Sequence, residues 1–223
     1  MHIVLGGTSG LGWELMSQLR GRDDRVIVLG QNHDAQYHGE GVRVDLYDPN
    51  DVEQAINQLQ EVCAGQHIES FVWAAGYGYR GNFADQSNVR SMGEVNFAGA
   101  LPVVQWAWRQ MIGQDLPSKL VVLGSTSGIR TRPDNTVYVA TKHAQTGFAR
   151  ALGEEAERLK VPVRVHLFVL GGMKTPFWTG WQPEDEEYST FNDPHKVASK
   201  IVQVVDSGIG HYTETIVERG TLV

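Results

Sequence analysis

The chain begins MHIVLGGTSGLGWELMSQLR over residues 1–20, and this stretch decides the fold. An apolar run at residues 3–5 leads into a glycine-rich turn at residues 6–12. Apolar residues with helical spacing follow over residues 11–20. A strand that passes through a glycine-rich turn into a helix is the pattern with which many α/β proteins bind a dinucleotide. The opening stretch therefore predicts an α/β fold with a phosphate-binding turn.

Three glycines of this turn have separate physical reasons to be there. Gly6 permits a tight turn off the strand, Gly10 lets the backbone approach a pyrophosphate, and Gly12 lets the helix pack closely on the strand. The start of the helix offers free backbone N–H groups and the positive end of the helix dipole. The predicted cradle consists of Gly6, Thr8, Ser9, Gly10, Leu11 and Gly12. The alternative is a glycine-rich loop that binds nothing.

Short apolar runs alternate with longer amphipathic stretches along the chain. Near-continuous Val, Ile and Leu runs indicate strands that are buried on both faces, and their alternation with helices predicts a doubly wound parallel sheet. The expected strands are residues 3–5, 26–29, 42–44, 71–73, 120–123 and 163–169, and the expected helices are residues 11–20, 51–63, 92–111, 137–159 and 194–205. We expect one Rossmann-like, three-layer αβα domain over residues 1–223, with a cofactor half over about 1–115 and a catalytic half over about 116–223.

The composition excludes several classes of function. A formal net charge of −7 argues against nucleic-acid binding, because no basic field is present to collect phosphates. A single cysteine, Cys63, suits a reducing compartment, and the histidines show no metal-ligand spacing. No apolar stretch approaches the ~20 residues of a membrane span, and no signal peptide precedes the first strand. We expect a cytoplasmic protein with no metal, no nucleic-acid partner and no membrane partner.

Tyr138 and Lys142 stand at positions i and i+4 of a predicted helix, so the phenol and the ammonium group share one helix face. A nearby cation favours phenolate, and we therefore expect Lys142 to lower the pKa of Tyr138 from about 10. Such a tyrosine can donate a proton to a carbonyl oxygen, or accept one in the reverse reaction. Ser125 follows the strand at residues 120–123, at the sheet edge where α/β proteins bind ligands.

With these motifs in this order, the sequence resembles the short-chain dehydrogenase/reductase family over nearly its whole length. The resemblance implies that Tyr138 is the acid/base and that Ser125 hydrogen-bonds the substrate oxygen. It implies that Lys142 lowers the tyrosine pKa and holds the nicotinamide ribose. It also implies that Asn96 supports a water-mediated proton relay, for which the alternative is an ordinary asparagine at a helix bend. A homodimer or homotetramer, formed through the two long helices, is a further implication. The tail at residues 215–220 resembles the family's final strand.

Two other segments resemble cofactor-binding elements of this family, with departures. Residues 74–76 resemble an Asn-Asn-Ala-Gly element beside the adenine ribose, but Trp73 and Ala74 replace the two asparagines. Residues 171–175 resemble a Pro-Gly-x-x-x-Thr element beside the nicotinamide carboxamide, with Gly171 in place of proline. The cofactor contacts that the resemblance implies are Ala74, Ala75, Gly76, Gly172 and Thr175.

The second predicted strand ends without an acidic residue. In NAD-binding folds an acid at this place binds the ribose hydroxyls, whereas an arginine accommodates the 2′-phosphate of NADP. Here Gln31, Asn32 and His33 could bond either sugar, and the missing carboxylate favours NADP(H) over NAD(H). Asp45 and Leu46 follow the third strand and are candidates for adenine contacts; a capping acid in a loop is the alternative for Asp45.

The leading interpretation is an NAD(P)(H)-dependent oxidoreductase, a reductase that moves hydride between nicotinamide and a small carbonyl/alcohol substrate. The alternatives are a non-catalytic dinucleotide-binding regulator and, less favoured by the short stretch after Thr175, an epimerase or dehydratase acting on a nucleotide sugar. The substrate stays open. Phe177, Trp178 and Trp181 either cover an apolar substrate or pack beneath a lid.

Overall fold

Seven parallel strands form one sheet in the part of the chain that the computed structural model describes, which comprises residues 1–22, 24–31, 40–179, 181–207 and 210–223. Their order is β3-β2-β1-β4-β6-β7-β9. The strands are β1 (His2–Leu5), β2 (Val26–Gly30), β3 (Gly41–Arg43), β4 (Ser70–Trp73), β6 (Ser118–Ser125), β7 (Val163–Leu170) and β9 (Tyr212–Val217). The chain runs outward from β1 to β3 and then returns to β4 on the other side of β1. Open α/β sheets bind ligands at such a reversal, beyond the carboxyl ends of the strands.

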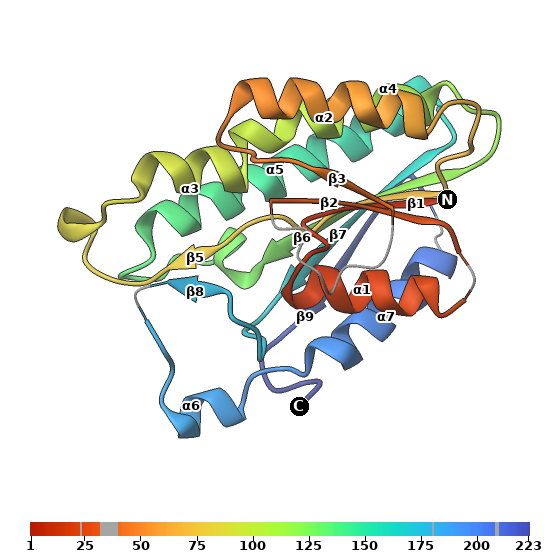
Figure 1. Cartoon of the computed structure of the whole chain (residues 1–223). Coiled ribbons are helices and arrows are strands. Elements are labelled where there is room, and N and C mark those ends of the chain that lie inside the picture. Colours follow the sequence, from red (N-terminus) through yellow and green to blue (C-terminus); the bar gives the residue numbers. More distant parts are fainter. Residues whose placement is uncertain (23, 32–39, 180, 208–209) are drawn as a thin grey trace.

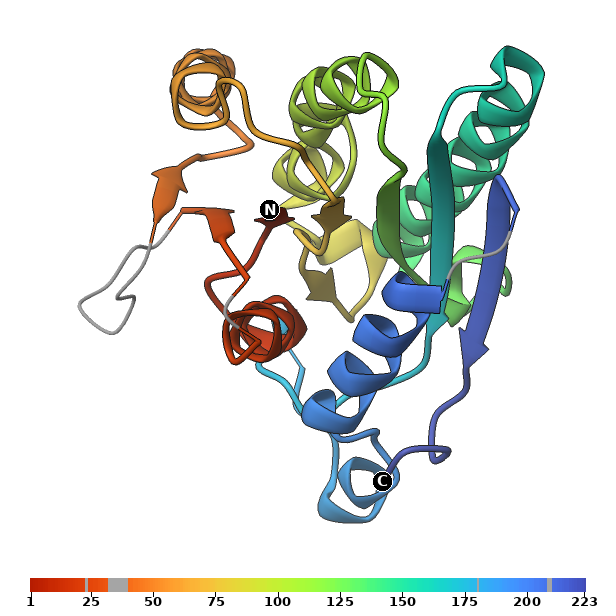
Figure 2. The same cartoon turned by 90° about the vertical axis from the view of Figure 1, so that its right-hand side faces the viewer.

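Helices cover both faces of the sheet (Figures 1 and 2). One face carries α2 (Pro49–Val62), α4 (Leu101–Ile112) and α5 (Thr136–Leu159), which share an apolar core with the sheet. The other face carries α1 (Gly10–Arg20) and α7 (Pro194–Ser207), which contact each other over a second core. Every residue of β1, β2 and β4 is buried, as the near-continuous apolar runs predict. The expected three-layer α/β fold is confirmed.

The single helix expected over residues 92–111 is wrong. The structure has α3 (Val89–Asn96), a 3₁₀ turn at Ala98–Ala100, and then α4 with a proline in its first turn. Gly99 lets this turn lie against the loop after β3, because a Cβ there would come within 1.8 Å of the carbonyl oxygen of Leu46. The apolar spacing continues across the break, so periodicity alone does not reveal it.

The C-terminal strand also lies earlier than expected. β9 ends at Val217, whereas the sequence suggested a strand over residues 215–220. Gly220 has a φ of +85°, a left-handed conformation that does not continue an extended strand. A small parallel ribbon, formed by β5 (Gly78–Tyr79) and β8 (Trp178–Thr179), was not expected at all. A short helix, α6 (Asp185–Ser189), follows it.

Among the described residues, no helix combines the length and the apolar character that a membrane crossing needs. Within the same ranges, His, Cys, Asp and Glu side chains form no group suited to a metal ion. Cys63 is a free, buried thiol, and burial raises its pKa to about 11. It is therefore held as a neutral, apolar side chain.

Candidate active site

The glycine-rich turn folds so tightly that larger residues do not fit at two of its glycines. Gly6 has a φ of +88°, and a Cβ there would lie 2.5 Å from backbone atoms of Ala75. A Cβ at Gly12 would lie 2.2 Å from the carbonyl oxygen of Gly6. Gly10 has a φ of +53°, which also favours glycine. The turn therefore lies against the end of β4, and the first turn of α1 packs directly on it.

The first turn of α1 suits an anion. Ser9 is its N-cap residue, makes no side-chain capping hydrogen bond within the described residues, and precedes a first turn without acidic residues. The backbone N–H groups of a first turn have no partner inside the helix, and they carry the positive end of the helix dipole. These features fit the phosphates of a dinucleotide. Thr8 lies against the end of β2, since a Cβ at Gly30 would lie 2.6 Å from its hydroxyl oxygen.

A cavity of about 580 Å³ lies at the carboxyl end of the sheet. Its size is within the range of small-molecule sites. The cavity is lined by Gly6, Thr8, Ser9, Gly10, Leu11, Gly12, Gln31, Asp45, Leu46, Ala74, Ala75, Gly76, Gly172 and Thr175, together with Ser125, Tyr138 and Lys142. Asn96, the remaining residue of the expected catalytic set, is not among the residues that line the cavity. The fold thus brings the glycine-rich turn and the Tyr-x-x-x-Lys motif to one cleft.

Gln31, which follows β2, and Asp45, which follows β3, both line the cavity and form a hydrogen bond with each other. The Gln31 side-chain amide donates to Asp45 Oδ2 at 2.9 Å, and the other carboxylate oxygen of Asp45 accepts from the backbone N–H of Tyr47 at 3.0 Å. Asp45 thus holds its own loop as well as lining the cavity. Asn32 and His33, the other candidates for the sugar, lie outside the described residues.

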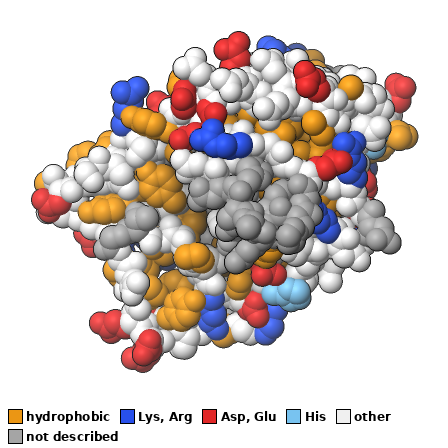
Figure 3. Space-filling view, in the orientation of Figure 1, with side chains coloured by type: hydrophobic (Ala, Val, Ile, Leu, Met, Phe, Trp, Pro, Cys, Tyr) orange, Lys and Arg blue, Asp and Glu red, His pale blue; other side chains and the backbone are white. Residues whose placement is uncertain are grey.

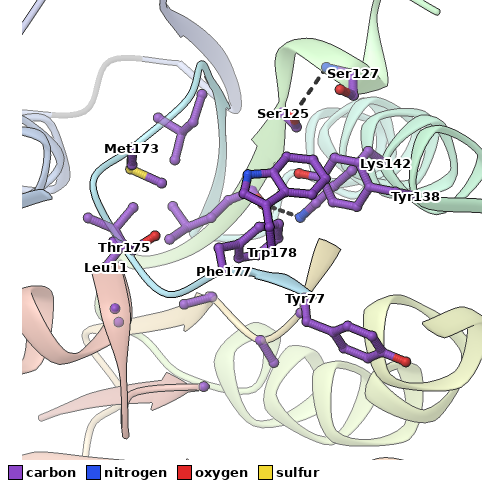
Figure 4. A pocket seen from close by; sticks show the side chains of 18 of the residues that line it. Leu11, Tyr77, Ser125, Ser127, Tyr138, Lys142, Met173, Thr175, Phe177 and Trp178 are labelled. Atoms are coloured by element: carbon purple, nitrogen blue, oxygen red, sulfur yellow. Dashed lines mark hydrogen bonds between the residues drawn. The ribbon is translucent and has the colours of Figure 1, made fainter. Parts of the chain in front are cut away.

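The catalytic candidates come from β6 and α5 and point into the same space (Figure 4). Tyr138 is 5% exposed, and its phenol lines the same cavity as the hydroxyl of Ser125. Ser125 itself accepts from the backbone N–H of Ser127 at 3.1 Å, which fixes its position at the end of β6. Lys142 is 4% exposed and donates to the carbonyl of Leu123 at 3.0 Å.

The expected lowering of the Tyr138 pKa by Lys142 is wrong for this structure. Burial raises the pKa of Tyr138 to about 12, and the neighbouring hydroxyl of Ser125 offsets only part of that rise. The ammonium nitrogen of Lys142 lies 5.8 Å from the centre of the tyrosine ring. Burial also lowers the pKa of Lys142 to about 7, which weakens the lysine as a cation near neutral pH. Desolvation is therefore the larger effect on both groups.

The side chain of Asn96, at the end of α3, forms hydrogen bonds with two other segments of the chain. Its side-chain amide donates to the carbonyl of Tyr77 at 2.9 Å and to the hydroxyl of Thr141 at 3.2 Å. Its Oδ1 accepts from the backbone N–H of Tyr77 at 2.9 Å. α3 ends at this residue, so Asn96 lies at the break within the stretch that the sequence predicts as one helix. These bonds join the chain after β4 to α5, on which Tyr138 stands.

Where the family resemblance implies two asparagines, aromatic packing steadies the centre of the sheet. Trp73 is fully buried, and its ring lies 6.1 Å from that of Phe97 and 5.9 Å from that of Phe148. Its indole N–H has no hydrogen-bond partner among the described residues. Dispersion and burial of aromatic surface therefore stabilise this part of the sheet in place of side-chain hydrogen bonds.

Aromatic side chains close over the tyrosine. The rings of Phe177 and Trp178 lie 5.6 and 5.1 Å from the ring of Tyr138, both edge to face (Figure 4). Trp178 is held over Gly78, where a Cβ would come within 2.4 Å of the indole. The ring centres of Trp181 and Trp178 lie 5.9 Å apart. The guanidinium carbon of Arg80 lies over the Trp181 ring, 4.5 Å from its centre. In the space-filling view, apolar side chains are exposed on the side of the molecule where β5 and β8 lie (Figure 3).

Sequence reasoning missed part of this site. Gln145 bonds to Lys142, Thr141 bonds to Asn96, and Glu187 at the cavity rim pairs with Arg219 at 2.9 Å. The signal for the first two was present, because both are polar residues on a helix face that also carries the motif. The salt bridge at the rim joins residues far apart in the chain and left no such signal.

The comparisons place the chain in a family. A profile described as short chain dehydrogenase matches residues 1–186, and the chain belongs to that family. Carbonyl reductase family member 4 of Danio rerio is 24% identical over 222 residues, which cover 93% of this chain and 91% of that protein. This confirms the resemblance that the motifs carry.

Solved structures share the fold over almost the whole chain. A short-chain dehydrogenase/reductase from Vibrio parahaemolyticus superposes with a TM-score of 0.81 at 22% identity, covering 98% of this chain and 99% of that one. A short chain dehydrogenase from Burkholderia cenocepacia J2315, solved in complex with NADP, gives a TM-score of 0.81 at 19% identity, with coverage of 98% and 96%. At such identities the likeness shows the fold alone.

Proposed function

We propose that this chain is an NADP(H)-preferring carbonyl reductase in which Tyr138 donates the proton to the substrate oxygen. The observation that carries the proposal is that the side chains of Ser125, Tyr138 and Lys142 line the same cavity as the glycine-rich turn. A bound nicotinamide dinucleotide would supply the hydride. The first turn of α1 would hold its phosphates, and Lys142 would hold its nicotinamide ribose.

The protonation state of Tyr138 favours the reductive direction. With a pKa of about 12, the phenol is neutral over the physiological range and is ready to donate a proton. As hydride reaches a carbonyl carbon, negative charge develops on the oxygen, and the hydroxyl groups of Ser125 and Tyr138 stabilise it there. Alcohol oxidation needs the phenolate, which burial disfavours.

The preference for NADP(H) rests on the end of β2. At the end of β2, Gln31 supplies an amide and not a carboxylate. The nearest acid, Asp45, follows β3 and accepts a hydrogen bond from that amide. A relative of the same fold was solved with NADP.

The substrate end of the cavity favours an apolar, planar carbonyl compound. Phe177 and Trp178 place aromatic surface within reach of the phenol of Tyr138, and the edges of such rings pack well on flat apolar groups. We further propose that the chain acts as one unit, since both halves line one cavity. We also propose a homodimer or homotetramer, which the family resemblance supports, and a cytoplasmic location, which suits the single cysteine.

Titration with NADPH and with NADH tests the proposal, followed by nicotinamide fluorescence and thermal shift. We expect NADPH to bind more tightly, with a rise in melting temperature that grows with concentration by mass action. Binding without turnover of any carbonyl compound would favour the alternative, a dinucleotide-binding regulator. Binding of neither cofactor would overturn the proposal.

A further inference from the structure

Gln145 lies beside the proposed catalytic group although it belongs to no motif. It follows Lys142 by three positions on α5, so the two side chains share a helix face. The residue is fully buried. Its Oε1 accepts a hydrogen bond from Lys142 Nζ at 2.7 Å, and its Nε2 donates to the main-chain carbonyl of Asn96 at 2.9 Å. Both ends of the amide therefore have partners.

The carbonyl of Asn96 is available because α3 ends there. Phe97 has φ −144° and ψ −71°, outside the helical region, and the carbonyls of a last helical turn lack regular partners within the helix. A buried carbonyl without a partner would be destabilising. Gln145 satisfies this carbonyl and thereby connects the bend after α3 to the lysine on α5.

The hydrogen bonds of the Lys142 ammonium group indicate the role of the Gln145 side-chain amide. An ammonium group has three N–H donors. The carbonyl of Leu123 takes one and Gln145 takes another, which leaves the third for the cavity that Lys142 lines. We propose that Gln145 is a positioning residue, which fixes the ammonium group of Lys142 by joining it to the carbonyl of Asn96. The inference rests on the proposed function in one respect, because Lys142 matters to turnover only if the chain is a reductase.

The geometry has a consequence for the charge of Lys142. Tyr138 is the titratable group near it on α5, β6 faces it with the carbonyl of Leu123, and the chain after β4 faces it with Gly76. With neutral surroundings and a pKa lowered to about 7 by burial, its charge depends on the two oxygen atoms that accept its N–H groups. Gln145 supplies one of them.

Two variants of similar size move this charge in opposite directions. Gln145→Met keeps the length of the side chain but removes the acceptor, so the pKa of Lys142 falls. Gln145→Glu places a carboxylate oxygen against the ammonium group, so that pKa rises. Thr146→Val is the matched control, since Thr146 is buried on the same helix and its hydroxyl has no hydrogen-bond partner among the described residues.

The decisive experiment is a pH titration of Lys142 by ¹³C NMR, on protein with labelled lysine Cε. We expect the pKa to fall by about one unit in Gln145→Met, to rise by about one unit in Gln145→Glu, and to stay unchanged in Thr146→Val. In turnover assays, the loss of kcat/KM with rising pH should move in the same two directions. Melting temperatures verify that each variant folds.

No shift, or shifts of the same sign in the Met and Glu variants, would overturn the role of Gln145. Because the NMR titration needs neither cofactor nor substrate, it decides on Gln145 even if the wild-type protein turns over no carbonyl compound. That second result would refute the proposed function alone.

Discussion

The two ends of the cavity are specified in different ways. In the glycine-rich turn, the backbone leaves no room for a Cβ at Gly6 and Gly12, so the requirement appears as one residue type at fixed spacing in a continuous stretch. At the catalytic end, Tyr138 packs against Phe177 and Trp178, which come from another part of the chain. A steric requirement within one continuous stretch can be predicted from the sequence. Contacts between side chains from distant stretches become visible only in the folded structure.

Tyr138→Phe should separate the two ends most sharply. The variant removes the proton donor and keeps the ring that packs on Phe177 and Trp178. We expect kcat to fall by about 100- to 10,000-fold. The Kd for NADPH, measured by fluorescence titration, should stay within about twofold. A comparable loss of cofactor affinity would contradict the separation.

Gly12→Ala tests the other end. Its Cβ would lie 2.2 Å from the Gly6 carbonyl oxygen, so backbone atoms must move. We expect the free energy of unfolding to fall by about 2–3 kcal/mol, with at least about tenfold weaker NADPH binding. The control is Gly147→Ala on the exposed face of α5, where no atom lies within 4 Å of the new Cβ. That variant should gain up to about 1 kcal/mol in a urea titration; equal stability of the two variants would show that the turn tolerates a side chain.

Lys142→Met should stabilise the protein while it impairs turnover. The pKa of Lys142 lies near 7 in the folded chain, below its ordinary value of 10.5, so the unfolded chain holds more protons between these values. Folding is therefore opposed at neutral pH, and the opposition fades as the pH rises toward 10.5. We expect the variant to be more stable by on the order of 2 kcal/mol at about pH 7, with a smaller difference at about pH 10. A pH-independent difference in urea titrations would contradict this account.

Trp178→Leu should have the smallest effect. It removes aromatic surface beside Tyr138 and leaves the proton donor in place. The KM for an aromatic ketone should rise about tenfold, with kcat little changed. Phe83→Leu is the control, because Phe83 is an aromatic residue that is 54% exposed and lies outside the cavity lining. If both variants shift KM equally, the aromatic lid does not contact the substrate.

Most of the fold could be predicted because buried parallel strands leave continuous apolar runs, as in β1 and β2. The errors lie where tertiary contacts decide. The bend at Ala98–Ala100 depends on a close approach to Leu46, and periodicity does not register it. The ribbon of β5 and β8 joins two short segments with no strand pattern of their own.

The sequence could predict which residues share the site, but it could not predict how deeply they are buried or what they contact. Spacing correctly placed Tyr138 and Lys142 on one helix face, but it gave the wrong direction for the tyrosine pKa. Burial is a property of the whole fold, and it outweighs a single neighbouring charge here. The bonds of Gln145 depend on where α3 ends, which the sequence did not reveal.

An isotope label shows directly whether the protein transfers hydride from NADPH to a carbonyl compound. Wild-type protein is incubated with NADPH that carries deuterium at the transferable position and with a small aromatic ketone, and the alcohol is analysed by mass spectrometry. We expect one deuterium per alcohol with wild-type protein, and formation slower by at least about 100-fold with Tyr138→Phe. Tight binding of NADPH without any deuterated alcohol, over a panel of carbonyl compounds, would contradict this expectation.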